Sequence, residues 1–114
     1  MADRGLSISL AALVVGLTLA LFPPSALGGD AQLGRQKAKM CQTCHGIDGL
    51  AKIPSAPHIA GESELYLVTQ LKAFRSGKRT HEIMSLIAQQ LSDEDIDNLA
   101  AWYSSIKIEV TVPE

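Results

Sequence analysis

The stretch Cys41-Gln42-Thr43-Cys44-His45 determines how the rest of this sequence is interpreted. It places two thiols on one turn of chain and an imidazole directly after the second thiol. Thiols at this spacing can add across the two vinyl groups of one porphyrin, and the adjacent imidazole can then bind the iron. The stretch therefore predicts one covalent haem c, attached through Cys41 and Cys44, with His45 as the first axial ligand of its iron.

Three other uses of these residues agree less well with the sequence. A redox-active dithiol of the thioredoxin type would need a strand before Cys41 and a βαβ pattern around it, and neither is predicted. A zinc site would need further ligands, and the only histidines, His45, His58 and His81, are not spaced as in zinc fingers. A disulfide between Cys41 and Cys44 would close a loop too small to stabilise the chain much.

The N-terminal residues 1–28 are predicted to be a signal peptide. Leu6 to Phe22 form an almost unbroken apolar run, and Ala26-Leu27-Gly28 offers small residues where a signal peptidase cleaves. Cleavage at that point would start the mature protein at Gly29. The apolar run is long for a signal peptide and short for a spanning helix, so an uncleaved membrane anchor is the alternative.

Residues 29–114 are predicted to form a single haem domain. A chain of this size has a marginal core, and a porphyrin would supply a large apolar body around which it could fold. We therefore expect the protein without haem to be poorly ordered. The formal net charge of −2 argues against a nucleic-acid partner, which would favour a strongly basic chain.

The mature part predicts an all-α fold with three main helices and no strand alternation. The first helix spans residues 31–40 and runs into the haem motif. The second follows Ser63 as N-cap and ends at Gly77, because serine favours helix starts and glycine favours helix ends. The last helix follows Ser92, with Asp95 three residues later as a variant of the capping box.

The segments between these helices are predicted to be loops or short helical pieces. Residues 45–61 contain three glycines and two prolines, a density that indicates a loop. Residues 78–83 are predicted to be a loop, followed by a short apolar stretch over 84–91. The β-branched tail, residues 107–114, is expected to fray or to cover an edge of the domain.

A haem that only transfers electrons needs a second strong axial ligand. The candidates are Met40, Met84, His58 and His81. Met40 directly precedes the first cysteine and is tied to the proximal side, whereas Met84 lies far along the chain, as a distal ligand must. We therefore predict Met84 as the distal ligand. His81 is its main competitor, and ligation by His81 would lower the reduction potential.

Several residues outside the haem motif give the sequence a resemblance to the class I c-type cytochromes. Gly34 stands where that family packs a glycine against its last helix, and Leu99 and Trp102 look like the residues that meet it. Pro57 stands where the family's proline carbonyl accepts the N–H of the proximal histidine, here His45. The resemblance implies the cytochrome c fold, with three main helices, short helical segments and loops wrapped around one covalent haem.

The sequence is most similar to small bacterial members of that family. The run Leu67 to Gly77 resembles one half of the di-haem bacterial cytochromes c. The segment 83–88 resembles the haem subunit of sulfide-oxidising flavocytochrome c. Mitochondrial relatives have prolines near the distal methionine, and this chain lacks them beside Met84.

The resemblance implies a mono-haem, His/Met-ligated electron carrier of the periplasm that is not itself an enzyme. Its partners would be other redox proteins rather than a small-molecule substrate, and it would meet a membrane only if residues 1–28 were retained. The alternative is a cytochrome subunit of a dehydrogenase complex, such as a flavoprotein dehydrogenase. A ligand-binding or peroxidase-like haem protein is less consistent with the sequence, because no distal acid/base pair is evident.

Two groups of charges have more than one interpretation. The basic cluster is formed by Lys72, Arg75, Lys78 and Arg79. It could dock a partner or bind the haem propionates, or it could be a solvated helix end whose positive charge suits the helix dipole. The acidic run over residues 93–97 is most simply the capped start of the last helix, and docking of a partner is its alternative interpretation.

Overall fold

The computed structural model describes Met1 and residues 28–114. The signal peptide predicted over residues 1–28 therefore lies outside the described residues, apart from its two ends. The described part is all-helical, as predicted, and contains no strand. Its helices are α1 (Ala31–Lys37), the 3₁₀ turn η1 (Ala38–Met40), α2 (Gln42–His45), α3 (Glu64–Ser76), α4 (Glu82–Gln89) and α5 (Asp93–Ser105).

The start of α1 is fixed by a side chain, and its end leads directly into the haem motif. The Asp30 carboxylate accepts hydrogen bonds from the backbone N–H groups of Gln32 and Leu33. These bonds satisfy two of the donors that a helix N-terminus leaves free. The helix predicted over 31–40 is present, but its last turn tightens to the 3₁₀ helix η1 before Cys41.

The predicted caps of α3 and α5 are confirmed. The Ser63 hydroxyl accepts from the Tyr66 N–H, and Gly77 ends α3 with a left-handed φ of +80°. Ser92 and Asp95 form a reciprocal capping box at the start of α5.

The prediction of a loop over residues 78–83 is wrong at its end, because α4 begins at Glu82. His81 is the unexpected N-cap. Its Nδ1 accepts from the backbone N–H groups of Ile83 and Met84, at 3.2 and 3.3 Å. Met84 therefore lies in the first turn of a helix rather than just after a loop.

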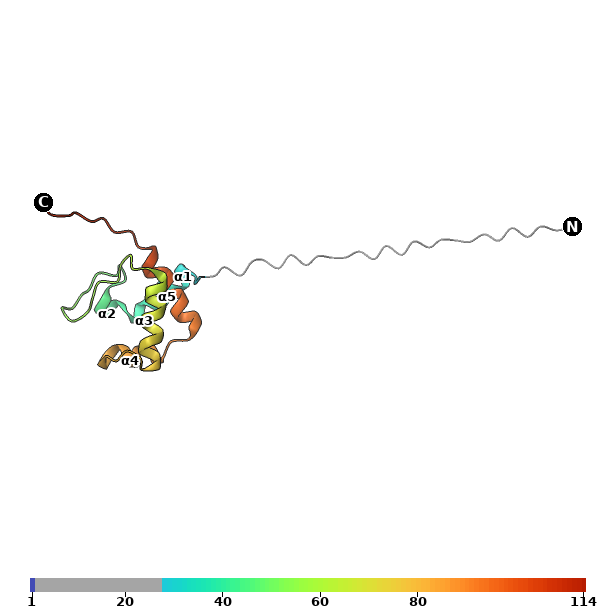
Figure 1. Ribbon diagram of the computed structural model, residues 1–114, viewed down its shortest axis with the longest axis horizontal. Helices are drawn as coiled ribbons and strands as arrows, with labels where there is room; N and C mark the ends of the chain where they lie inside the picture. The colour runs from blue at the N-terminus through green and yellow to red at the C-terminus, as the bar shows by residue number, and fades with distance from the viewer. Residues whose placement is uncertain (2–27) are drawn as a thin grey trace.

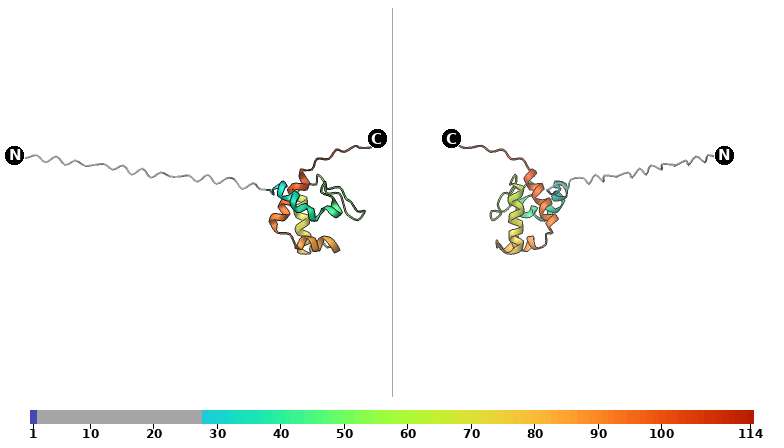
Figure 2. Two further views of the ribbon diagram at one scale, coloured as in Figure 1. Left: turned by 180° about the vertical axis from the view of Figure 1, so that it is seen from behind. Right: turned by 45° about the vertical axis from the view of Figure 1, so that its right-hand side comes forward.

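The helices pack in the order α1 on α5, α5 on α3, and α3 on α4, as Figure 1 and Figure 2 show. The two helices nearest the ends of the described chain are thus neighbours. Gly34 permits this contact, since a Cβ built there would lie 1.9 Å from the Asn98 carbonyl oxygen and 2.9 Å from Trp102 Cβ. Leu99 lies behind this contact in the buried core, with Ile96, Ala100 and other residues.

The segment between α2 and α3 is the predicted loop. It is held by backbone bonds, with the Ile59 and Ala60 N–H groups both donating to the Gly49 carbonyl. The Gly61 N–H donates to the Tyr103 carbonyl at 2.9 Å, which ties the end of the loop to α5.

The tail after α5 is extended and leads away from the helices (Figure 1). Ile108 lies beside Gly61, where a Cβ would be 3.2 Å from its Cγ1. Val110 and Val112 are 76% and 79% exposed. The tail thus covers one edge of the domain at its start and is exposed beyond it. Within residues 28–114, none of the helices has the length and apolar character needed to cross a membrane.

Candidate functional site

The haem motif forms one compact turn followed by α2. The His45 N–H donates to the Cys41 carbonyl at 2.9 Å, which closes the turn that carries both cysteines. Both thiols are free and partly exposed. The two thiols required for covalent haem attachment therefore form no disulfide with each other and lie on the same turn.

His45 is 8% exposed, and its ring orientation is fixed by the loop that follows it. Its Nδ1 lies 2.9 Å from the Pro57 carbonyl oxygen. Because a carbonyl can only accept, Nδ1 carries the proton and Nε2 is left as the nitrogen with a free lone pair. An imidazole held in this tautomer is suited to bind a metal ion through Nε2.

Two aromatic side chains of α5 bind the backbone immediately after His45. The Tyr103 hydroxyl donates to the Gly46 carbonyl, and Trp102 Nε1 donates to the Ile47 carbonyl, both at 3.0 Å. Neither bond is predicted by the sequence pattern, which gives Trp102 only a packing role against Gly34. The available signal was two adjacent aromatics, each with a polar atom, at the end of a buried helix.

Cys41 is partly exposed as a residue, but its thiol is surrounded mostly by protein atoms. Burial raises its pKa to about 11, while the nearby Tyr103 hydroxyl and Lys37 ammonium act in the opposite direction. The thiol is therefore protonated at neutral pH in the folded chain. Burial also raises the pKa of Tyr103 well above its usual range.

The predicted distal ligand and its competitors lie on other segments. Met84 is partly buried on α4, which packs on α3 and makes no extensive contact with α2. His81 is exposed, and its Nδ1 is used in capping α4. His58 is also exposed, and its Nδ1 accepts from the Ala51 N–H at 2.8 Å. The structure thus brings His45 and Pro57 together and places Met84 on a separate helix.

Two members of the basic cluster have partners within the fold. The Arg75 guanidinium donates to the Leu91 carbonyl and to the Asp93 carboxylate, and it lowers the pKa of Asp93. The Arg79 guanidinium lies 4.5 Å from the centroid of the Phe74 ring. These contacts favour the helix-end interpretation for both arginines.

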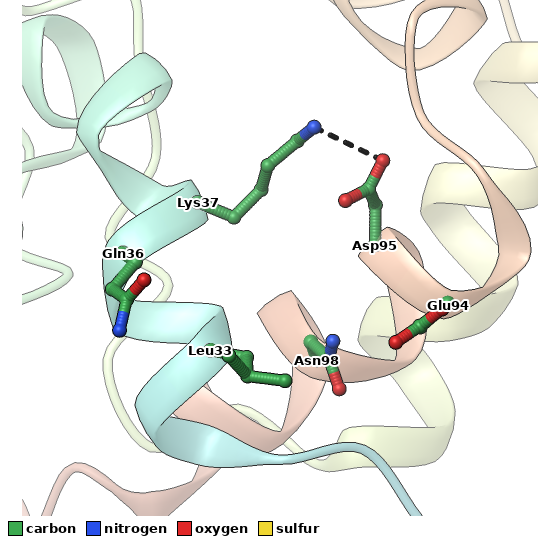
Figure 3. A pocket seen from close by; sticks show the side chains of 6 residues that line it. All are labelled: Leu33, Gln36, Lys37, Glu94, Asp95 and Asn98. Atoms are coloured by element: carbon green, nitrogen blue, oxygen red, sulfur yellow. Dashed lines mark ion pairs between the residues drawn. The ribbon is translucent and has the colours of Figure 1, made fainter.

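A hollow between α1 and α5 is not part of the haem site. Figure 3 shows the Lys37–Asp95 ion pair, 3.0 Å long, at one side of it. Its lining residues are Leu33, Gln36, Lys37, Glu94, Asp95 and Asn98. None of the predicted haem-site residues is among them.

The donor set defines the class of protein. Two unpaired thiols beside an oriented imidazole match the requirements of a covalently attached haem, and a thioether on another helix matches those of a second axial ligand. The residues present therefore fit haem c, and the fold and site together define a c-type haem protein. The family model for cytochrome c matches residues 31–107, and the chain belongs to the cytochrome c family.

Membership of this family establishes a covalently bound haem c with iron as the cofactor. It also confirms the class I cytochrome resemblance seen in the sequence.

Three curated relatives show how far the similarity extends. The chain is 40% identical to cytochrome c4 of Pseudomonas aeruginosa over 94 residues, covering 82% of this chain and 47% of that protein. It is 45% identical to cytochrome c-554(548) of Halomonas halodenitrificans over 80 residues, covering 68% and 96%. It is 40% identical to a thiosulfate dehydrogenase electron acceptor of Thiomonas intermedia over 73 residues, covering 62% and 33%.

A solved structure supports the fold independently. Reduced recombinant cytochrome c4 from Pseudomonas stutzeri matches with a TM-score of 0.65 and 36% identity, over 69% of this chain and 46% of that one. The chain thus spans about half the length of the cytochrome c4 proteins that it matches.

Proposed function

We propose that this protein is a periplasmic one-electron carrier with a single haem c. Cys41 and Cys44 would hold the haem through thioether bonds, and His45 and Met84 would bind its iron. The observation that carries the proposal is the 2.9 Å contact between His45 Nδ1 and the Pro57 carbonyl, which leaves Nε2 for the metal. Electron transfer then needs no substrate site in the chain.

When bound, the haem supplies a one-electron couple between ferric and ferrous iron. The residues of the chain set the energy of that couple. A hydrogen bond from His45 to Pro57 makes the imidazole more basic, which favours the oxidised iron. A methionine thioether as second ligand shifts the balance toward the reduced iron and raises the reduction potential.

The proposed location is the periplasm. It rests on the apolar segment within residues 1–28 and on its small-residue cleavage site, which are properties of the sequence. Cleavage would release the domain that starts at Gly29, whereas retention of the segment would anchor it to the membrane.

Redox proteins are the proposed partners. One relative is named as an electron acceptor for thiosulfate dehydrogenase, which supports the delivery of electrons to this chain by a dehydrogenase. The same observation favours a second candidate function, that of a cytochrome subunit held in a dehydrogenase complex. Co-purification with a dehydrogenase at a fixed ratio would support the subunit, and a monomer that exchanges electrons with several partners would support the free carrier.

Replacement of Met84 by alanine tests the distal ligand. We expect Met84→Ala to remove the methionine–iron charge-transfer band of the oxidised protein and to lower the reduction potential, because the thioether is lost. The measurements are an absorption spectrum and a redox titration.

Two variants serve as controls for this experiment. Met40→Leu changes a partly buried methionine next to the haem motif, and His81→Asn removes the competing imidazole while keeping a side-chain acceptor at the N-cap of α4. Both should retain the band. A Met84→Ala protein with an unchanged spectrum would show that another residue binds the iron.

A further inference from the structure

We propose that Tyr103 is a positioning residue for the proximal haem ligand, because its hydroxyl holds the Gly46 carbonyl directly after His45. The proposal goes beyond the electron-carrier function and rests on one part of it, the assignment of His45 as an iron ligand.

Tyr103 lies in the last full turn of α5 and is 3% exposed. Its hydroxyl donates to the Gly46 carbonyl, one residue after His45, in a buried bond of 3.0 Å. The Cys41 side chain, at the start of the motif, lies near the same hydroxyl. One side chain from a distant helix therefore holds the backbone directly after His45 and lies near the first residue of the motif.

The chemistry of the phenol assigns a direction to its bond with Gly46. A phenol has one proton, and the Gly46 carbonyl can only accept it. A thioether sulfur carries no proton, so the attachment of haem to Cys41 leaves the bond between Tyr103 and Gly46 in place.

The Gly46 carbonyl belongs to a tight turn directly after His45, so a bond to it restrains the backbone next to the ligand. Gly46 adopts a φ of +75°, and a Cβ there would lie 2.6 Å from the Leu50 carbonyl oxygen, so the turn after His45 is tight. Trp102 holds the next carbonyl, that of Ile47. The backbone after the histidine is thus fixed by α5, while the ring itself is fixed by Pro57.

Loss of the Tyr103 hydroxyl should therefore change the position of the His45 ring relative to Pro57. Without the phenol, the buried Gly46 carbonyl would keep only the Gly49 N–H, at 3.2 Å, and would no longer be held by α5, which favours a shift of this turn. A shift of the turn would lengthen the bond between His45 Nδ1 and Pro57. A weaker bond makes the imidazole less basic, so the oxidised iron is less stabilised and the reduction potential rises.

The test compares Tyr103→Phe with Tyr66→Phe in the full, haem-loaded protein. Tyr66 is a tyrosine on α3 that is 48% exposed, so its variant makes the same chemical change away from the motif. In Tyr103→Phe we expect the His45 Nδ1 proton to exchange with solvent roughly three- to tenfold faster, the size of effect expected for one hydrogen bond. NMR of the reduced protein measures the exchange rate, and a redox titration should show an upward shift in potential.

The proposal fails if Tyr103→Phe lowers only the stability while its proton exchange and potential match those of Tyr66→Phe. Tyr103 would then be a core-packing residue. If Tyr103→Phe does not accumulate, Trp102→Phe removes the neighbouring donor and should shift exchange and potential in the same directions. Unchanged values in Trp102→Phe would overturn the proposal.

A wrong assignment of His45 would be recognised separately. In that case the His45 ring protons of the reduced wild-type protein would lack the large shifts that a haem ring imposes on its axial ligands. That result precedes any comparison of variants, so it is distinguishable from a failure of the Tyr103 proposal.

Discussion

Gly34 lies where α1 and α5 approach so closely that a methyl group does not fit. The nearest atoms are the backbone carbonyl of Asn98 and the Cβ of Trp102, neither of which is the end of a flexible side chain. A larger residue must therefore push the two helices apart. Because Trp102 also binds the Ile47 carbonyl, such a movement would reach the haem segment.

Gly34→Ala should destabilise the protein by about 2 kcal/mol, within the range measured for overpacked interiors. The free energy of unfolding, measured with denaturant, gives the value. Gln36→Ala is the matched control, because it changes an exposed residue of the same helix and should leave the stability nearly unchanged. Equal stabilities for the two variants would contradict the close approach of the helices.

At the scale of secondary structure, the capping box makes the start of α5 sensitive to acid. A hydrogen bond from the Ser92 backbone N–H lowers the pKa of Asp95 below its ordinary value of 3.8, and Lys37 contributes in the same direction. A carboxylate with a depressed pKa stabilises the fold above pH 3.8. That stabilisation is lost as the pH falls through the lower, folded-state value.

Asp95→Ala should therefore cost about 1 kcal/mol at neutral pH, a typical value for a lost cap, and less in strong acid. Denaturant unfolding of both proteins at pH 7 and below pH 3 checks this convergence. Glu94→Ala, a change in the same turn that removes no capping group, should show a small effect at either pH. A gap between wild type and Asp95→Ala that stays constant in acid would contradict the argument.

The sequence predicted those elements whose signals are local. Ser63, Gly77 and Ser92 mark helix ends through their own backbone and side-chain chemistry, and the structure agrees with each. The start of α4 was missed because a histidine cap at His81 is not a common helix signal. The bonds from Tyr103 and Trp102 were missed because they join residues 57 and 55 positions apart, and no local pattern reports such distances.

The predicted site also has a part that a local motif specifies and a part that depends on contacts between distant segments. The cysteines and the proximal histidine share one short motif, and the contact of His45 with Pro57 is seen directly. Met84 as distal ligand stays a prediction, because it depends on an arrangement across two helices that the motif does not encode.

Considered as a whole, the described domain has a small core for its length. Its ten buried apolar residues include four alanines, and within residues 28–114 the largest fully buried side chain is Ile96. Burial of apolar area on this scale stabilises a domain only weakly against its conformational entropy. The cofactor is therefore expected to contribute a large part of the stability.

A chain that cannot attach haem tests this expectation. The double variant Cys41→Ala/Cys44→Ala should lose most of the helical circular dichroism of the haem-loaded wild type and should unfold without a cooperative transition. The wild-type protein from the same expression host is the control. A double variant with wild-type helicity and a sharp thermal transition would show that the chain folds without the cofactor.

The pairing of α1 with α5 also sets a sequence of events during protein synthesis. A polypeptide leaves the ribosome with its N-terminus first, so Cys41 and Cys44 emerge some sixty residues before Tyr103, the residue that helps to enclose Cys41. Throughout that interval the burial that raises the pKa of the Cys41 thiol cannot exist. The Cys41 thiol is therefore accessible and closer to its ordinary pKa in the unfolded chain, so haem attachment is favoured before α5 packs on α1 rather than after.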